Sequence, residues 1–481
     1  MLFNSYAFIF LFLPLSLAAF YAARRIGNGH AALAVTILSS LAFYAYWRAA
    51  YVPVLICSIL INYAVGTAIV RGVARFPLIS IGVCANLSFL AYFKYSDFLI
   101  GQLNMLGTDL PLPHVALPLA ISFYTFQQIA YLVDCYRGKL KEPGFAEYVF
   151  TVTFFPHLIA GPIVRMREIL PQFEAFAKKP FLQNVALGLV IFIIGLGKKV
   201  LIADHFGQLS DPFFASVASG HVAASLDAWG ATLSYTLQIY FDFSGYSDMA
   251  IGLSRMFGFR LAVNFLSPYQ AVSIADFWRR WHVTLSRFLR DYLYVPLGGS
   301  RRGRVQTYVN LLATMALGGL WHGASWTFVA WGLYHGFLLA LHRLWRDFGS
   351  GSIPNAISAA MTFLAVVIGW VLFRSHDFHS AGAMLAAMFT PIHTPSIMPT
   401  QAWLAIVAAL IFTWVSPNIY QIFCQFRPAL ILRNQFPMLH PISLNYSFGF
   451  TVIEAIFVSV VLMACLVGMR GVVSTFLYFM F

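Results

Sequence analysis

The chain has 481 residues, of which 60% are hydrophobic and only 10% are charged, a balance far from that of soluble globular proteins. Uncharged apolar runs of roughly 20 residues recur along the whole length, which predicts a polytopic membrane protein with little room for a soluble domain. The net charge of +13 does not indicate a nucleic-acid partner, because the basic residues lie in short clusters at the ends of apolar runs, the positive-inside pattern.

The first third of the chain gives the most regular pattern. Membrane spans are predicted at roughly 5–22, 31–47, 51–70 and 77–96, and a fifth apolar run follows the Gly/Pro-rich loop 97–116. Basic clusters alternate with these runs, so the predicted topology has the N-terminus and the loop outside and the basic ends in the cytoplasm. The N-terminus has no basic n-region, which favours a retained first span over a cleaved signal peptide.

The segment 154–162 carries prolines at positions 156 and 162, with His157 between them. Proline breaks helical pairing, and backbone freed at membrane depth must be buried in protein or line a cavity. The sequence therefore predicts a broken or re-entrant segment here. A further span is predicted near 183–203, and a long apolar stretch follows at 226–254.

Residues 255–304 hold the densest positive charge and are expected to face the cytoplasm. Within them, 274–292 scans as one amphipathic helix lying at the inner membrane surface, with His282 at the border of the apolar face. Pro296 and the glycines after it are expected to end this helix.

The segment between Arg304 and Arg343 has basic residues at both ends, so it is expected to cross the membrane an even number of times. His322 lies near its turning point and therefore at depth. Later spans are predicted near 357–373, 402–424 and 449–469, with an outer loop at 375–400. The fold class is thus an all-α polytopic membrane protein of about 11 transmembrane helices plus re-entrant and interfacial helices around a central cavity, forming one integral-membrane domain over 1–481.

Two Trp-His pairs carry the candidate chemistry, 281–282 and 321–322. His322 is flanked by glycines and could act as a general base that takes a proton from an attacking hydroxyl; it could instead be a packed histidine satisfied by a neighbour. His282 could be a second acid or base, or a donor-binding group, against an interfacial histidine that reaches the headgroups. Taken singly, the packed interpretation of His322 and the interfacial interpretation of His282 are favoured. Ionisable groups inside a membrane commonly serve a function, however, and the presence of two such histidines 40 residues apart strengthens the catalytic interpretation of both.

Four further residues are candidates for a cavity or an orienting role. Asp242 and Asp248 lie in an apolar region and could orient a histidine, or could equally pair with a basic residue to brace two helices. Asn310 is either a cavity hydrogen-bonder or interhelical glue, and His157 either lines the cavity or satisfies broken backbone.

No metal site is expected. The loop histidines have irregular spacing and a solvated loop explains them better; they are His376, His379 and His393. The five cysteines show no paired spacing and are interpreted as small buried hydrophobes.

Seven motifs resemble, in order, those of the membrane-bound O-acyltransferase family, in its bacterial branch that acetylates exopolysaccharides of the alginate type. The most distinctive are Phe-Phe-Pro-His-Leu-Ile-Ala-Gly-Pro-Ile-Val-Arg (154–165), Asp-Phe-Trp-Arg-Arg-Trp-His (276–282) and Gly-Gly-Leu-Trp-His-Gly (318–323); the others cover 121–128, 134–138, 240–248 and 294–299. The chain departs from the resemblance at His157, where glutamine is expected in many relatives.

The resemblance implies that His322 is catalytic and that His282 is a second functional residue. It also implies a bacterial inner-membrane enzyme that takes an acetyl thioester such as acetyl-CoA from the cytoplasm. The acceptor would be a polysaccharide, reached directly or through a periplasmic acetyltransferase partner protein. Acetylation of cellulose or another polymer remains an alternative, as do a transporter of acyl groups or glycans that makes no bond and a scaffold for polysaccharide secretion.

Overall fold

The computed structural model describes residues 1–26, 29–174, 181–348, 351, 353–390, 396–430, 447–470 and 474–477. These residues form helices joined by loops, with one isolated parallel bridge between Ala262 and Leu430, so the predicted all-α class is confirmed. The α-helices are α1 (Leu13–Ile26), α2 (Gly29–Arg48), α3 (Val52–Val70), α4 (Arg75–Met105), α5 (Ile121–Tyr136), α6 (Phe145–Thr153), α7 (Phe155–Leu158), α8 (Met166–Glu174), α9 (Phe181–Gly197), α10 (Asp204–Ala218), α11 (Ser225–Met256), α12 (Ile274–Arg280), α13 (Val283–Leu289), α14 (Arg304–His322), α15 (Trp326–Phe348), α16 (Asn355–Arg374), α17 (Phe378–Phe389), α18 (Thr400–Val415), α19 (Ile419–Ile422) and α20 (Val452–Gly468).

Short π and 3-10 segments adjoin several of these helices: η1 (Ala7–Phe12), η2 (Ala49–Tyr51), η4 (Lys198–Ala203), η5 (Pro268–Gln270), η6 (Arg290–Tyr294) and η7 (Cys424–Phe426). Five helical runs among the described residues are long and apolar enough to cross a membrane: Ala7–Ile26, Gly29–Val70, Arg75–Met105, Leu182–Ala218 and Asn355–Arg374. The second run contains both α2 and α3. The predicted membrane protein is thus confirmed, while the figure of about 11 spans stays a prediction.

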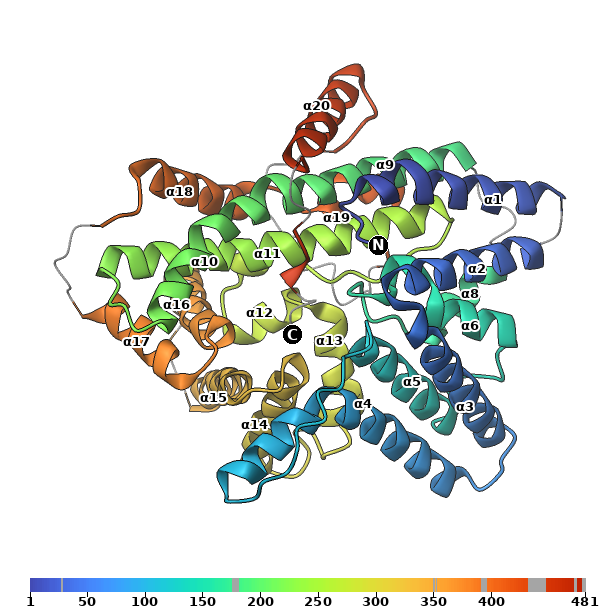
Figure 1. Cartoon of the computed structure of the whole chain (residues 1–481), viewed down its shortest axis with the longest axis horizontal. Coiled ribbons are helices and arrows are strands. Elements are labelled where there is room, and N and C mark those ends of the chain that lie inside the picture. Colours follow the sequence, from blue (N-terminus) through green and yellow to red (C-terminus); the bar gives the residue numbers. More distant parts are fainter. Residues whose placement is uncertain are drawn as a thin grey trace.

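Helix α11 forms the centre of the molecule, and nearly all of its residues are buried. It crosses the bundle beside α9 and α10 (Figure 1). An ideal Cβ at Gly188 of α9 would lie 2.4 Å from the carbonyl oxygen of Gly252, and one at Gly195 would lie 2.7 Å from that of Gly245. Small residues spaced two turns apart on both helices therefore let the two backbones meet, as in other membrane helix pairs.

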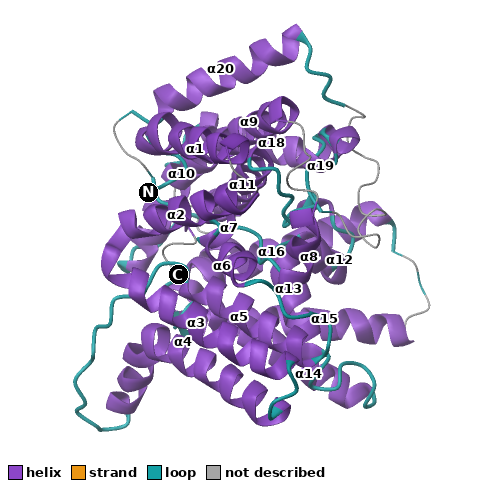
Figure 2. Cartoon of the chain, turned by 90° about the vertical axis from the view of Figure 1, so that its right-hand side faces the viewer, coloured by secondary structure: helices purple, strands orange, loops and turns teal. Residues whose placement is uncertain are grey.

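Two groups of helices lie together on one side of α11 (Figures 1 and 2). The hairpin of α14 and α15 lies next to α4, and α3 and α5 pack beside α4 (Figures 1 and 2). Helix α20 lies at the periphery of the bundle in both views. The candidate histidines therefore come from the region where the hairpin, α5 and the α12–α13 segment meet.

The prediction of one amphipathic helix over 274–292 is wrong. The chain forms α12 and α13, which are separated at Trp281 and His282, and His282 has a left-handed φ of 40°. Main-chain bonds to a neighbouring loop replace the helical ones, because Arg280 O accepts from Leu266 N and Val283 N donates to Asn264 O. The periodicity is correct on each side of the break, but tertiary pairing overrides it.

Three other boundaries differ from the prediction. Helix α4 continues to Met105, and the expected outer loop 375–400 contains α17, whose N-terminus is capped by Asp377 in a reciprocal box with Ser380. The predicted span 402–424 ends at Val415, because Pro417 lacks the donor that would continue α18. By contrast, the segment 154–162 is broken as predicted, with Phe154 outside helical geometry between α6 and α7.

Candidate active site

The hairpin of α14 and α15 places His322. An ideal Cβ at Gly319 would lie 2.1 Å from the carbonyl oxygen of Phe328, and one at Gly332 would lie 2.2 Å from that of Met315. Side chains at these two positions would hold the helices apart, so glycine permits their close contact. His322 is the last residue of α14, and the extended Gly323 starts the short turn into α15.

Aromatic rings surround the imidazole of His322, which is only 4% exposed. Its centroid lies 5.0 Å from the ring of Trp321, 5.3 Å from that of Trp331 and 5.2 Å from that of Phe373, all in edge-on geometry. These contacts come from α14, α15 and α16. The position of the ring is therefore fixed from three helices.

A cavity reaches this histidine. Its volume, including the open solvent at its mouth, is about 640 Å³, and its lining includes Lys94, Ser122, Phe123, Trp321 and His322. It lies where α5 begins, whereas the other end of α5 meets the basic segment, since Arg137 donates to Asp291 O at 3.1 Å. The cavity and the basic segment are therefore at opposite ends of the bundle.

His282 is completely buried. It is therefore not a histidine at the membrane surface that reaches the lipid headgroups, which was the alternative interpretation of the sequence. Its Nδ1 lies 3.3 Å from Asn264 Oδ1, which also accepts from the Thr284 N–H at 3.2 Å. Because that main-chain N–H can only donate, the Asn264 atom is an acceptor and His282 supplies the proton from Nδ1. Nε2 is then the basic nitrogen of the neutral ring.

Trp321 connects the two histidines. Its ring centroid lies 5.0 Å from that of His322 and 6.3 Å from that of His282. The structure thus brings together the two residues that the Trp-His motifs predicted, although 40 positions separate them in sequence.

A column of aromatic rings extends from Trp321 toward the basic end. Trp321 stacks on Phe126 at 5.1 Å, Phe126 stacks on Phe288 at 4.1 Å, and Phe288 contacts Tyr292 at 5.0 Å. The Arg165 guanidinium lies 5.1 Å from the centroid of the Tyr292 ring. Side-chain contacts are therefore continuous from the basic segment to His322.

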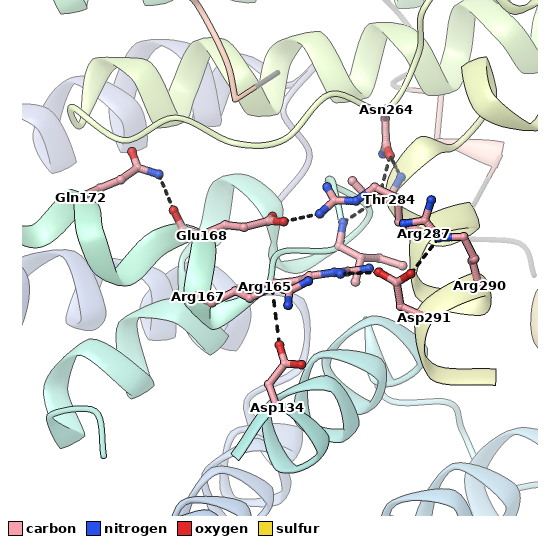
Figure 3. A network of polar contacts seen from close by, with 11 residues as sticks. Asp134, Arg165, Arg167, Glu168, Gln172, Asn264, Thr284, Arg287, Arg290 and Asp291 are labelled. Atoms are coloured by element: carbon pink, nitrogen blue, oxygen red, sulfur yellow. Dashed lines mark hydrogen bonds and ion pairs between the residues drawn. The ribbon is translucent and has the colours of Figure 1, made fainter. Parts of the chain in front are cut away.

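Ion pairs organise the basic end (Figure 3). Arg165 contacts Asp291 at 2.8 Å, Arg290 contacts the same carboxylate at 2.7 Å, and Arg287 pairs with Glu168. Burial alone would raise the pKa of Asp291, but hydrogen bonds from the two arginines lower it to about 2. Several arginines of the basic segment are thus already engaged within the protein.

Asp242 and Asp248 accept from lysines of η4 rather than from either histidine. Lys199 Nζ lies 2.5 Å from Asp242, and Lys198 Nζ lies 2.6 Å from Asp248. Leu477 N also donates to Asp242 at 3.0 Å. These contacts brace α11 against η4 and the C-terminal segment.

Asn310 bonds to the irregular backbone before α14, and His157 contacts a side chain of the neighbouring helix α5. Asn310 Nδ2 donates to Gly299 O at 2.9 Å, which ties α14 to the turn before it. His157 is buried, and Gln127 Nε2 lies 3.2 Å from its Nδ1. Neither residue is among those that line the cavity at His322.

Two polar residues near His322 were missed by the sequence prediction. Lys94 Nζ donates to Trp321 O at 2.6 Å and to His322 O at 3.0 Å. His335 is buried beside Trp331 at 4.9 Å, and neither ring nitrogen has a hydrogen-bond partner within the described part of the chain. A lone lysine inside an apolar run was the signal for Lys94.

Of the loop histidines, His376 and His379 are not among the residues that line the cavity at His322. His376 lies just before α17, His379 is the second residue of α17, and His393 lies outside the described residues. Across the described ranges, no three His, Cys, Asp or Glu side chains are grouped as metal ligands would be.

The sequence matches the profile described as MBOAT, membrane-bound O-acyltransferase family, over residues 73–373. It is 41% identical to a peptidoglycan O-acetyltransferase of Helicobacter pylori over 81% of this chain and 80% of that protein. It is 42% identical to the "Probable alginate O-acetylase AlgI" of Pseudomonas aeruginosa over 81% of this chain and 75% of that protein. A teichoic acid D-alanyltransferase of Streptococcus thermophilus is 28% identical over 53% of this chain and 68% of its own length. The chain therefore belongs to the membrane-bound O-acyltransferase family, and it is an acyltransferase.

Proposed function

We propose that the chain is a multi-pass enzyme of the bacterial inner membrane that passes acetyl from a cytoplasmic thioester, acetyl-CoA, to a hydroxyl on the periplasmic side. The observation that carries the proposal is that His322 lines a cavity at the end of the bundle opposite the basic segment. By the positive-inside rule, that end faces the periplasm. The names of the relatives favour a polysaccharide acceptor, and alginate-type exopolysaccharide is the first polymer to examine.

In the proposed reaction, the imidazole of His322 takes the proton of the acceptor hydroxyl as its oxygen attacks the thioester carbonyl carbon. The carbonyl becomes an oxyanion, which collapses as the carbon–sulfur bond breaks. The thiolate then receives the proton from the imidazolium, so an ester and a free thiol leave. His282, joined to His322 through Trp321, would hold or move a second proton from Nε2.

The donor is expected to bind at the basic end. Arg287 and Arg290 are engaged in ion pairs, so the exposed Arg279, Arg301 and Arg302 are the better candidates for its phosphates. The thioester arm would then follow the aromatic column to Trp321. This order of contacts leads it to the imidazole from the side opposite the cavity.

The immediate acceptor is either a sugar hydroxyl or a serine of a periplasmic acetyltransferase partner that completes the transfer. Both present an alcohol oxygen, so the chemistry at His322 is the same. The cavity lining offers the hydroxyl of Ser122 and the aromatic rings of Trp47 and Phe123 to either acceptor.

The test is replacement of His322 by alanine in the producing strain, followed by measurement of acetyl ester in the secreted polymer. His376, which is exposed near α17, provides the matched control. We expect His322→Ala to abolish acetylation at unchanged protein level and His376→Ala to leave it unaltered. Normal acetylation in His322→Ala would refute the mechanism, and normal acetylation in His282→Ala as well would indicate a scaffold.

A liposome assay separates an enzyme from a transporter. Purified protein is supplied with labelled acetyl-CoA on the basic side and with de-acetylated polymer on the other. Ester that forms with wild type and disappears with His322→Asn indicates bond formation. Labelled material that crosses unchanged, with His322→Asn as active as wild type, indicates transport.

A further inference from the structure

Helix α4 supplies the hydrogen bonds that the end of α14 needs. Lys94 donates to the carbonyl oxygens of Trp321 and His322, and the next residue, Tyr95, donates from its hydroxyl to Leu320 O at 2.8 Å. The last carbonyls of a helix have no partner within the helix, and they carry partial negative charge that favours a cation. Lys94 and Tyr95 thus share the task of capping α14.

Only one of these two neighbours reaches the cavity. Lys94 lines it together with His322, whereas Tyr95 is not among the lining residues. An ammonium has three N–H donors, and two of those of Lys94 are directed to main-chain carbonyls. Within the described ranges, no carboxylate oxygen lies within 4.0 Å of its Nζ, so no ion pair neutralises this cation.

A cation without a carboxylate partner is costly inside a membrane protein, and such a residue commonly serves a function. Helix capping accounts for hydrogen bonds, but a neutral donor such as the Tyr95 hydroxyl does the same at Leu320. The end of α14 and the Trp321 ring, whose centroid lies 5.9 Å from Nζ, favour the positive charge but leave its third N–H unused. The reaction proposed above gives that N–H a role, because negative charge develops on the acyl oxygen beside His322.

We propose that Lys94 is a catalytic residue that stabilises the oxyanion formed when the acceptor hydroxyl attacks the thioester carbonyl. This inference rests on the proposed acetyl transfer. The third N–H of the ammonium donates to the carbonyl oxygen as the carbon–oxygen double bond becomes a single bond. The oxyanion collapses and the thiolate leaves with the proton held by His322, so Lys94 keeps its own protons throughout.

The experiment uses the full chain in nanodiscs, with acetyl-CoA as donor and chemically de-acetylated exopolysaccharide of the host as acceptor, and it follows free thiol and ester. Lys94→Met removes the charge and all three N–H donors at similar side-chain length, and Lys94→Arg keeps a cation. Tyr95→Phe is the matched control, since it removes a bond to the same helix end without altering the cavity lining. His322→Ala tests the proposed function separately.

For Lys94→Met we expect a maximal rate lowered about 10²-fold or more, as for loss of one oxyanion donor, with the KM for acetyl-CoA changed much less. Lys94→Arg should retain part of the rate, and Tyr95→Phe should stay within about threefold of wild type, since it leaves the cation in place. Equal losses in Lys94→Met and Tyr95→Phe would overturn the proposal and leave Lys94 as a cap.

If Lys94→Met does not fold, Lys94→Cys provides the test, because an aminoethyl thiosulfonate attaches an ammonium group to the cysteine. Wild type treated in the same way is the reagent control. Rescue by this reagent but not by its neutral methyl analogue supports the proposal, and equal rescue by both refutes it. If His322→Ala retains activity, the proposed function fails. If only His322→Ala is inactive, the proposed function stands and the role of Lys94 is refuted.

Discussion

Gly319 lies one helical turn before His322 and offers the sharpest test of how the hairpin positions the imidazole. An ideal Cβ there would lie 2.1 Å from the carbonyl oxygen of Phe328 and 3.1 Å from the Cα of Gly332. Both atoms belong to the backbone of α15, so no side-chain rotation relieves the contact. Ordinary van der Waals contact begins at 3.4 Å, so Gly319→Ala requires the helices to separate by about 1.3 Å.

Two effects oppose each other in the stability of this variant. Alanine gains about 1 kcal/mol of helix propensity over glycine, while overpacking costs about 1–3 kcal/mol. The net loss is therefore small, and the protein is expected to remain folded. The rate should fall about 10²-fold, because a shift of about 1 Å at a reacting group has that effect.

The assay is acetyl transfer per folded protein, with the thermal midpoint measured in the same detergent. Gly101→Ala in α4 is the control, since an ideal Cβ at Gly101 meets no atom within 4 Å. It gains the same propensity without the clash, so its midpoint should rise and its rate should not change. If Gly319→Ala works as fast as Gly101→Ala, the hairpin contact does not set the position of His322.

Three further outcomes follow from the contacts around the site. Asn264→Leu removes the acceptor of His282 Nδ1 and is expected to lower the rate at least tenfold, whereas Asn264→Asp should retain more; the assay is again acetyl transfer. Lys199→Met leaves Asp242 buried without its cation, which should cost about 3–5 kcal/mol, and adding Asp242→Leu should recover part of the thermal midpoint. Burial alone would raise the pKa of Asp291, but its arginine partners lower it to about 2, so its ion pairs stabilise the fold above about pH 4 and lose that contribution as the pH falls toward 2. Asp291→Asn should therefore weaken the dependence of the thermal midpoint on pH between about pH 4 and pH 2.

Periodicity and charge patterning were sufficient to predict the class of the protein and the placement of His322. Apolar runs predicted α2, α3 and α16 to within a few residues, because a membrane span is dictated by local composition. The basic residues around 304 and 343 predicted an even number of membrane crossings with His322 near the turning point. His322 does lie at the turn between α14 and α15, while the crossings stay a prediction. These features depend on short stretches of sequence and not on contacts between distant residues, so a single sequence is enough to predict them.

The break at His282 could not be predicted in the same way. The segment 274–292 has a helical period throughout, and the interruption comes from main-chain bonds to the loop at 264–266. Nothing in the local pattern reveals that Asn264 will occupy the position next to His282. Likewise, Asp242 and Asp248 left the choice between a histidine and a basic partner open, and only the fold places them on Lys199 and Lys198.

Lys94 was missed for a different reason. It lies inside the apolar run 77–96, and the mean hydropathy of such a run predicts a span whether or not it contains a single lysine. The contacts now assign that cation to the last turn of α14, far along the chain. A lysine within a predicted span is thus a candidate donor to the unpaired carbonyls at the C-terminus of another helix.

Both candidate histidines lie where regular helix stops, and this has a physical consequence. A helix end or a break exposes main-chain groups, and in a buried position such an irregularity persists only where other groups of the protein satisfy them. Lys94 does so at His322, and Asn264 does so at His282. The geometry of the two imidazoles is therefore maintained by these partners as much as by the Trp-His motifs, and variants of the partners should impair transfer before they impair folding.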